Sequence, residues 1–198
     1  MKYHSERQDY YAKLARSQGY RSRSAFKLLE IQERFRLIKP SMVVVELGSA
    51  PGGWSQVLSR QIKGNGQLLA CDRLMMRPVA GCDFIQGDFT DPAVVSQIKQ
   101  HMNRPADLIV SDMAPDLTGD AFQDQVNTYH LLSTVIDTLA QLLRPKGAFL
   151  CKAFHGSEFA DFRDLCRSNF TKVQEIKPKS SRPQSNEVFL LSSGYQLC

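Results

Sequence analysis

An apolar strand that opens into a glycine-rich turn constrains this chain more than any other feature of its sequence. Residues 43–54 read VVVELGSAPGGW, a β-branched run that ends in an acid and is followed by glycines at 48, 52 and 53. A turn of this kind before a helix brings bare backbone N–H groups close to a small ligand, where side chains would block the approach. The pattern predicts a nucleotide-like cofactor, although the spacing is not the G-x-G-x-x-G of nicotinamide and flavin binders.

From residue 42 onward, short apolar runs alternate with longer amphipathic segments. This alternation is typical of βαβ units around a mostly parallel sheet, and so of an α/β fold. Strands are predicted at 42–47, 67–71, 83–86, 106–111, 147–151, 170–176 and 187–192. Helices are predicted at 54–62, 92–101, 122–143 and 157–168, with Pro145-Lys146-Gly147 ending the third.

The excess positive charge is confined to the start of the chain. Residues 1–40 contain ten Lys and Arg against four Asp and Glu, whereas the other 158 residues contain fifteen against sixteen. A helix is predicted over 23–36, with Lys27 beside its apolar stripe. We expect one domain over residues 1–198, with 1–40 as a basic extension that contacts phosphates. A plain solvated helix is the alternative for this extension.

The composition also limits location and metal content. No uninterrupted apolar run reaches the roughly 18 residues needed to span a bilayer, and the N-terminal residues contain no apolar signal core. We therefore expect a cytoplasmic protein without membrane contact, and a monomer as the default. The five cysteines and four histidines lack metal-ligand spacing, so no metal site is predicted.

Charged residues directly follow four of the predicted strands. They are Asp72, Asp88, Asp112 and Lys152. In an open α/β sheet the ligand lies outside the carboxyl ends of the strands, so these side chains should converge on one crevice. Asp72 lies twenty residues after Gly52, an interval that suits an acid bound to ribose hydroxyls. Taken singly, Asp72 and Asp88 have an alternative interpretation as helix-cap or turn residues.

Lys152 is the least expected member of this set, because a lysine directly after a buried strand is costly unless it has a partner or a task. Asp112 is the natural partner. If the last strand runs antiparallel, Glu187 at its start lies at the same edge of the sheet and joins the other two residues.

Five parts of the sequence carry a family resemblance. The segments ELGSAPGGW, RSRSAFKL, SDMAP and SNEV, together with Lys152, resemble the motifs of the FtsJ/RrmJ family of S-adenosylmethionine-dependent methyltransferases. The likeness extends over nearly the whole chain. It implies a Rossmann-like methyltransferase fold, a mostly parallel seven-stranded sheet with an antiparallel last strand and helices on both faces.

The resemblance also implies an activity and a set of residues. The activity is methyl transfer from S-adenosylmethionine to the ribose 2′-hydroxyl of a uridine in large-subunit ribosomal RNA, within the assembled subunit. Lys152 is the implied base or hydroxyl-positioning residue, with Lys27 and Asp112 beside it and Glu187 in support. The implied cofactor-binding residues are Gly48, Gly52, Gly53, Trp54, Asp72, Asp88 and Asp112. Trp54 has an alternative interpretation as a core aromatic residue, and Glu46 replaces the aspartate usual in the family.

The RNA contacts are assigned to two basic stretches. The candidates are Arg21, Arg23, Arg34, Lys179 and Arg182, and tyrosines of the N-terminal extension are candidates for base stacking. The second stretch, residues 177–183, lies just before Glu187 and is interpreted as an RNA clamp or as a solvated loop. The extension is shorter before Lys27 than the family pattern predicts.

Three other functions remain open from the sequence. The same four charged residues suit a transfer RNA or messenger-cap 2′-O-methyltransferase, because they recognise a ribose hydroxyl and not a particular RNA. A ribosome assembly factor that holds S-adenosylmethionine but contributes mainly by binding RNA, with little catalysis, is an alternative from a different class. A nicotinamide-dependent reductase is favoured only by the generic strand, glycine turn and helix.

Overall fold

The computed structural model describes residues 2–113, 134–156, 159–181 and 184–196, with residues 2–9 through their backbone alone. Seven strands form one sheet in the order β3-β2-β1-β4-β5-β7-β6. The strands are β1 (Val43–Leu47), β2 (Gln67–Asp72), β3 (Asp83–Gln86), β4 (Ala106–Ser111), β5 (Leu143–Phe154), β6 (Phe170–Ile176) and β7 (Glu187–Tyr195). β7 alone runs in the direction opposite to the other six strands. The prediction of a mostly parallel sheet with an antiparallel last strand is therefore confirmed.

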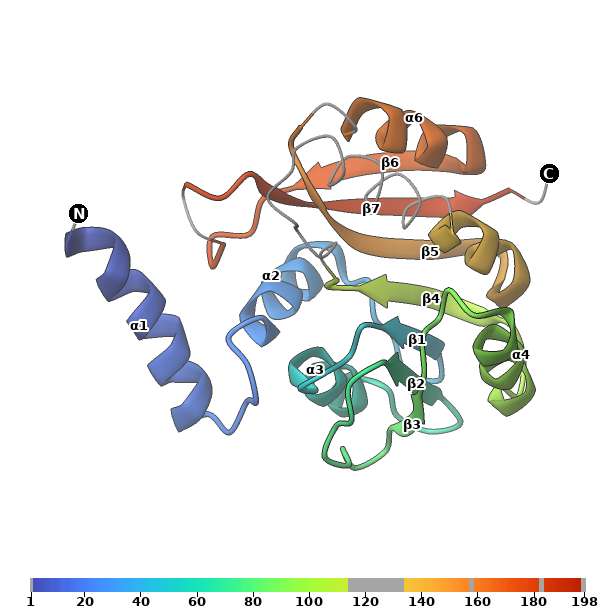
Figure 1. The fold of residues 1–198 in the computed structure, drawn as a ribbon, viewed down its shortest axis with the longest axis horizontal. Helices are drawn as coiled ribbons and strands as arrows, with labels where there is room; N and C mark the ends of the chain where they lie inside the picture. The colour runs from blue at the N-terminus through green and yellow to red at the C-terminus, as the bar shows by residue number, and fades with distance from the viewer. Residues whose placement is uncertain (1, 114–133, 157–158, 182–183, 197–198) are drawn as a thin grey trace.

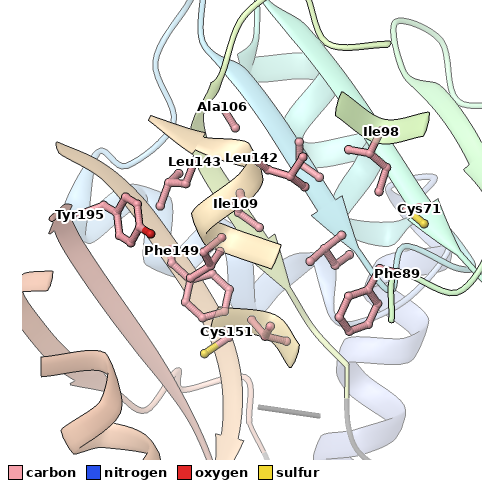
Figure 2. Packing of buried hydrophobic residues seen from close by; sticks show 14 of the residues in the cluster. Cys71, Phe89, Ile98, Ala106, Ile109, Leu142, Leu143, Phe149, Cys151 and Tyr195 are labelled. Carbon is pink, nitrogen blue, oxygen red and sulfur yellow. The ribbon is translucent and has the colours of Figure 1, made fainter. Parts of the chain in front are cut away.

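Helices cover both faces of the sheet, as expected. On one face lie α4 (Pro92–His101), a helical segment over 134–142 and α6 (Phe159–Asn169). Figure 2 shows this layer, in which Leu142 and Ile98 of the helices belong to the same buried cluster as Ile109 and Phe149 of the strands. On the other face, α2 (Ala25–Phe35) and α3 (Gly53–Gln61) pack through Leu28, Trp54 and Leu58.

The N-terminal stretch divides into two parts. Helix α1 (Lys2–Ser17) extends away from the sheet (Figure 1), and contacts α2 through Tyr11, whose ring centroid lies 5.5 Å from that of Phe26. Helix α2, in contrast, contributes Ala25 and Ile31 to the buried core. Part of the segment predicted as a basic extension is thus a packed layer of the fold.

The strand β5 differs from its prediction. It begins at Leu143 and not at residue 147, because the Pro-Lys-Gly sequence lies inside the strand as an irregularity. Ala106 pairs with Leu143, and the next paired residue, Leu108, is opposite Ala148. Lys146 has a φ of 62°, so the backbone leaves and rejoins the ladder there. Most of the helix predicted at 122–143, and the start of that at 157–168, lie outside the described residues.

No helix in the described ranges is both long and apolar enough to cross a membrane.

Candidate active site

The register of the sheet brings three of the predicted catalytic residues to one edge. Leu47 of β1 pairs with Ser111 of β4, and Ser111 pairs with Cys151 of β5. Asp112 and Lys152 follow these paired residues directly, so they lie side by side at the carboxyl ends of parallel strands. Because β7 runs antiparallel, its first residue, Glu187, lies opposite Phe154 at the same edge.

Lys27 completes this edge from the helical layer. It lies on α2, with its side chain 8% exposed, and its Nζ is 2.7 Å from Glu187 Oε1 and 2.8 Å from Oε2. The same ammonium is 5.6 Å from the centroid of the Phe189 ring, which adds a cation–π contact. The lysine stem packs in the core while its head group reaches the sheet edge, as predicted from its position beside the apolar stripe.

The second pair joins Lys152 to Asp112. Lys152 Nζ lies 3.2 Å from Asp112 Oδ1, and it donates a hydrogen bond to the backbone carbonyl oxygen of the same residue. Asp112 Oδ1 is buried and accepts no hydrogen bond within the described part of the chain. The ion pair therefore leaves a buried acceptor beside the Lys152 ammonium.

The two pairs also influence each other electrostatically. Burial raises the pKa of Glu187, but the hydrogen bond and charge of Lys27, the Ser181 hydroxyl and the charge of Lys152 together lower it below its usual value. Glu187 is thus held as a carboxylate. With two lysines and two carboxylates, the four residues have no net formal charge.

The glycine turn after β1 is closed mainly by contacts within the protein. Gly48 has a φ of 77° and Gly52 one of 101°. A Cβ at Gly48 would meet the Met113 side chain at 2.0 Å, and one at Gly53 would meet Ser22 Oγ at 2.1 Å. The missing side chains at Gly48 and Gly53 therefore let neighbouring protein segments pack closely, in addition to any approach by a ligand.

Asp72 and Asp88 both make local contacts. Asp72 accepts hydrogen bonds from the backbone N–H groups of Ala50 and Leu74, each at 2.8 Å, and so ties the glycine turn to the segment after β2. Asp88 accepts hydrogen bonds from the N–H and the hydroxyl of Thr90. Burial raises the pKa of Asp88, but these bonds and the charge of Arg73 outweigh that effect, so the pKa is lowered. These are the turn contacts of the alternative interpretation, and each carboxylate retains free lone pairs.

Trp54 lies in the core. Its side chain belongs to the cluster under α2, with its ring centroid 5.7 Å from that of Phe189, and the residue is 2% exposed. Its indole N–H donates to the Ser24 carbonyl oxygen at 2.9 Å. The structure thus favours the core-aromatic interpretation of Trp54 over a direct contact with a cofactor.

Two buried oxygens at the sheet edge fit a polar cofactor. Ser49 Oγ and Asp112 Oδ1 follow the paired strands β1 and β4, and neither has a hydrogen-bond partner among the described residues. Buried polar atoms are normally hydrogen-bonded, so a ligand that carries hydrogen-bond donors would suit these two oxygens. An ammonium group such as that of the methionine part of S-adenosylmethionine has the donors that these two oxygens need.

Glu46 is a buried residue of β1, two positions before Gly48. It is 2% exposed, and Ser55 Oγ donates to its Oε2 at 2.6 Å. Burial raises the pKa of Glu46 to about 8, an effect that Ser55 opposes and that the nearby carboxylates of Asp112 and Asp72 increase. The side chain is therefore largely protonated at neutral pH.

The structure places the predicted RNA-binding residues in different settings. The Arg21 guanidinium donates to the carbonyl oxygens of Pro51, Arg77 and Pro78 at 3.2, 2.5 and 2.7 Å, so it ties the glycine turn to the segment after β2. Arg34 is exposed, with its guanidinium 4.9 Å from the Phe35 ring centroid. Arg23 is half-buried, Lys179 is exposed, and Arg182 lies outside the described residues.

Sequence reasoning missed two residues at this edge. Ser181 donates its hydroxyl to Glu187 Oε1 at 2.9 Å. Phe154 is 41% exposed, although it lies opposite Glu187 and two residues after Lys152 on the same side of β5. The available signal for Phe154 was an aromatic residue two positions after Lys152, on the same side of the predicted strand, whereas nothing local marks Ser181.

Comparison with known proteins gives consistent matches. The model of the FtsJ-like methyltransferase family matches residues 20–195. A protein named ribosomal RNA large subunit methyltransferase E from Pseudomonas fluorescens is 48% identical over 189 residues, which cover 95% of this chain and 90% of that protein. Its namesake from Marinobacter nauticus is 45% identical over 190 residues, covering 96% of this chain and 92% of that protein.

Solved structures give the same fold. A ribosomal RNA methyltransferase from Plasmodium falciparum superposes with a TM-score of 0.78 at 25% identity, covering 89% of this chain and 98% of that one. The MycE methyltransferase of the mycinamycin pathway, crystallised with Mg and SAH, has a TM-score of 0.57 at 15% identity, covering 93% of this chain and 49% of that one.

Proposed function

The chain belongs to the FtsJ-like methyltransferase family, and we propose that it transfers a methyl group from S-adenosylmethionine to a ribose 2′-hydroxyl of large-subunit ribosomal RNA. The observation that carries this proposal is the meeting of two ion pairs, Lys27–Glu187 and Lys152–Asp112, at the sheet edge beside the glycine turn. The relatives named for methylation of the large-subunit RNA support the substrate. A uridine in the assembled subunit is the proposed target.

The ribose 2′-hydroxyl is a weak nucleophile, and the residues of the site must make it reactive. The bound cofactor would supply an electrophilic methyl group: one C–O bond forms, the bond between that methyl carbon and the sulfonium sulfur breaks to leave a thioether, and the hydroxyl proton is released. Holding the hydroxyl oxygen in line with this methyl group can supply about 7–11 kcal/mol. The hydrogen bond from Lys152 to the Asp112 backbone fixes the Nζ that holds this oxygen.

The proton leaves toward the groups around that nitrogen. Lys152 Nζ is the proposed acceptor, and Asp112 Oδ1, which accepts no hydrogen bond from the described residues, lies 3.2 Å from Nζ as a second one. Lys27 and Glu187 do not need to titrate for this step. Their contact fixes α2 against β7, and so maintains the wall of the site.

The target nucleotide also needs a contact for its base. The exposed ring of Phe154, on the same side of β5 as Lys152, offers a stacking surface at the edge where the ribose must lie. Arg34 on α2 and Lys179 on the loop held against α2 are exposed. Their positive charges are available to RNA phosphates.

Methyl transfer to purified large subunits tests this function directly. Subunits from a strain that lacks the protein are incubated with methyl-labelled S-adenosylmethionine and then digested to nucleosides. We expect one labelled 2′-O-methyl nucleoside, which is lost in Lys152→Ala. Lys172→Ala, which removes an exposed lysine from β6, is the matched control and should retain full transfer.

The other outcomes would point to other functions. Label in transfer RNA or capped RNA, but not in subunits, would replace the substrate and keep the reaction. Retention of the in vivo role by Lys152→Ala would favour an RNA-binding assembly factor. Absence of any transfer, together with tight binding of a nicotinamide cofactor, would contradict the methyltransferase assignment for this chain.

A further inference from the structure

A loop between β6 and β7 is anchored to α2 by one carboxylate. Glu30 Oε2 accepts a hydrogen bond from the Lys179 backbone N–H at 2.6 Å, and Glu30 Oε1 accepts one from the Ser180 N–H at 3.0 Å. These residues are about 150 positions apart in the chain. Hydrogen bonds from backbone N–H groups to a carboxylate are among the stronger ones in proteins, so this contact fixes the loop on the helix.

The anchored residues lead directly to the active site. Ser181 follows Ser180, its N–H donates to the Pro178 carbonyl oxygen at 3.1 Å, and its hydroxyl donates to Glu187 Oε1 at 2.9 Å. Both Ser180 and Ser181 are 5% exposed, although they lie in a polar, basic stretch of sequence. The loop is therefore packed as a turn that reaches Glu187, and it is not a solvated connection at these residues.

The contacts form a closed ring that begins and ends on α2. Glu30 holds the loop, the loop holds Glu187 through Ser181, and Glu187 pairs with Lys27, one helical turn before Glu30. Two residues of one helix thus fix both sides of the same carboxylate. Glu30 binds the backbone of Lys179, and the side chain of Lys179 is exposed on this loop.

We propose that Glu30 is a positioning residue for methyl transfer, which sets the orientation of Glu187 through Ser181 and presents Lys179 to RNA phosphates. This inference rests on the proposed RNA methyltransferase function. Glu30 touches neither cofactor nor substrate. Its effect is to order the loop before RNA binds, which removes an entropic cost from binding, and to hold the Lys27–Glu187 pair in one geometry.

Four variants separate this role from a general effect of charge or stability. Glu30→Ala removes both acceptors, whereas Glu30→Gln keeps one. Ser181→Ala breaks the link to Glu187 and leaves the anchor intact. Glu33→Ala removes an exposed carboxylate from the same helix, three residues further on, and is the matched control.

Amide hydrogen exchange gives the readout that does not depend on activity. In Glu30→Ala we expect faster exchange at the Lys179 and Ser180 amides, while Ser181→Ala and Glu33→Ala leave these two amides as in the wild type. Thermal unfolding of each variant shows whether the fold is retained, and Glu30→Gln serves if Glu30→Ala fails to fold.

Kinetics on large ribosomal subunits then test the consequence. We expect Glu30→Ala to raise KM for the subunit and to lower kcat by about tenfold, the scale of a small misplacement of catalytic groups, with unchanged affinity for S-adenosylmethionine. Ser181→Ala should lower kcat alone. Because both act through Glu187, the double variant should lose less kcat than the product of the two single losses.

Each remaining outcome counts against the proposal in a distinct way. Faster amide exchange with unchanged kcat and KM would make Glu30 a structural anchor without a catalytic effect. Equal losses in Glu33→Ala would assign the effect to helix charge. If the wild type itself methylates no RNA, the proposed function fails, and the exchange data would still report whether Glu30 anchors the loop.

Discussion

Lys152 contacts Asp112 twice, through a 3.2 Å ion pair to Oδ1 and a hydrogen bond to the backbone carbonyl oxygen. The hydrogen bond to the main chain fixes the Lys152 ammonium. Asp112 Oδ1 is buried and accepts no hydrogen bond from the described residues. One aspartate thus both positions the lysine and offers an oxygen to a ligand.

This double contact predicts different losses for the two residues. Lys152→Met should lower methyl transfer by about 10²- to 10⁴-fold with little change in cofactor affinity, because it removes only the group at the hydroxyl. Asp112→Asn should lower both quantities, because the amide also removes a charged acceptor for the cofactor. Single-turnover transfer and calorimetric titration measure the two effects. Equal cofactor affinity in both variants would contradict the shared role of Asp112.

The buried pair of Lys27 and Glu187 predicts a pH-dependent stability. Lys27→Met should destabilise the protein by about 3 kcal/mol, since it leaves Glu187 charged without its partner. The pKa of Glu187 is lowered in the fold, so its stabilising effect is present above the ordinary value of 4.5 and is lost as pH falls through the lower folded value. The unfolding free energies of wild type and Glu187→Gln in urea should therefore begin to converge as pH falls below 4.5, and should meet below the lower folded value. A constant difference would contradict this.

Glu46 should show the opposite pH dependence. Its pKa is about 8 in the fold and 4.5 ordinarily, so the folded state holds a proton that the unfolded state has lost. Stability is full below pH 4.5 and declines, by at most about 1.4 kcal/mol per pH unit, until about pH 8. Glu46→Gln should remove this decline and be more stable than wild type at pH 8. Parallel pH profiles of the two proteins would refute the buried protonated carboxyl.

Arg21 should affect the cofactor before it affects RNA. Its guanidinium joins the carbonyl oxygen of Pro51, within the glycine turn, to that of Pro78, in the segment after β2. Loss of these charge-assisted bonds in Arg21→Ala should weaken S-adenosylmethionine binding by about tenfold or more. Arg34→Ala, on an exposed side chain, should instead weaken RNA binding. If Arg21→Ala lowers RNA affinity alone, the residue is an RNA contact, as the sequence predicted.

Phe154 should respond to the loss of its aromatic ring more than to the loss of its volume. Phe154→Leu keeps an apolar side chain and should raise KM for the subunit by about tenfold, whereas Phe154→Tyr should remain close to wild type. The affinity for S-adenosylmethionine should be unchanged in both. Similar KM values for Phe154→Leu and wild type would exclude base stacking at this ring.

The sequence predicted the sheet well because its signals are local. The β-branched run before Gly48 and the apolar run before Asp112 end at the residues where the observed strands end. Parallel strands with buried faces require such runs, so their ends identify the residues at the active edge. The same argument predicts that Lys152 and Asp112 lie side by side, and in the structure they form an ion pair.

The parts that sequence reasoning missed depend on partners far along the chain. Arg21 could be read as an RNA contact because nothing near it reveals the carbonyl oxygens of Pro51 and Pro78. The backbone N–H groups that bind Glu30 lie about 150 residues away. Lys146 shows the opposite case, in which a local signal was misleading. The Pro-Lys-Gly sequence was predicted to end the helix before the strand, but it lies within β5 as an irregularity in the strand pairing.

The position of β7 affects the order in which the molecule can mature. Its residues are made after those of β6, yet the strand lies between β5 and β6 and pairs with both. β5 therefore lacks its outer neighbour, and β6 lacks any strand partner, until this last segment of the chain has been made. Because Glu187 is the first residue of that segment, Lys27 acquires its counter-ion at the same step. The set of four charges that we propose for catalysis is thus complete only after β7 has joined the sheet.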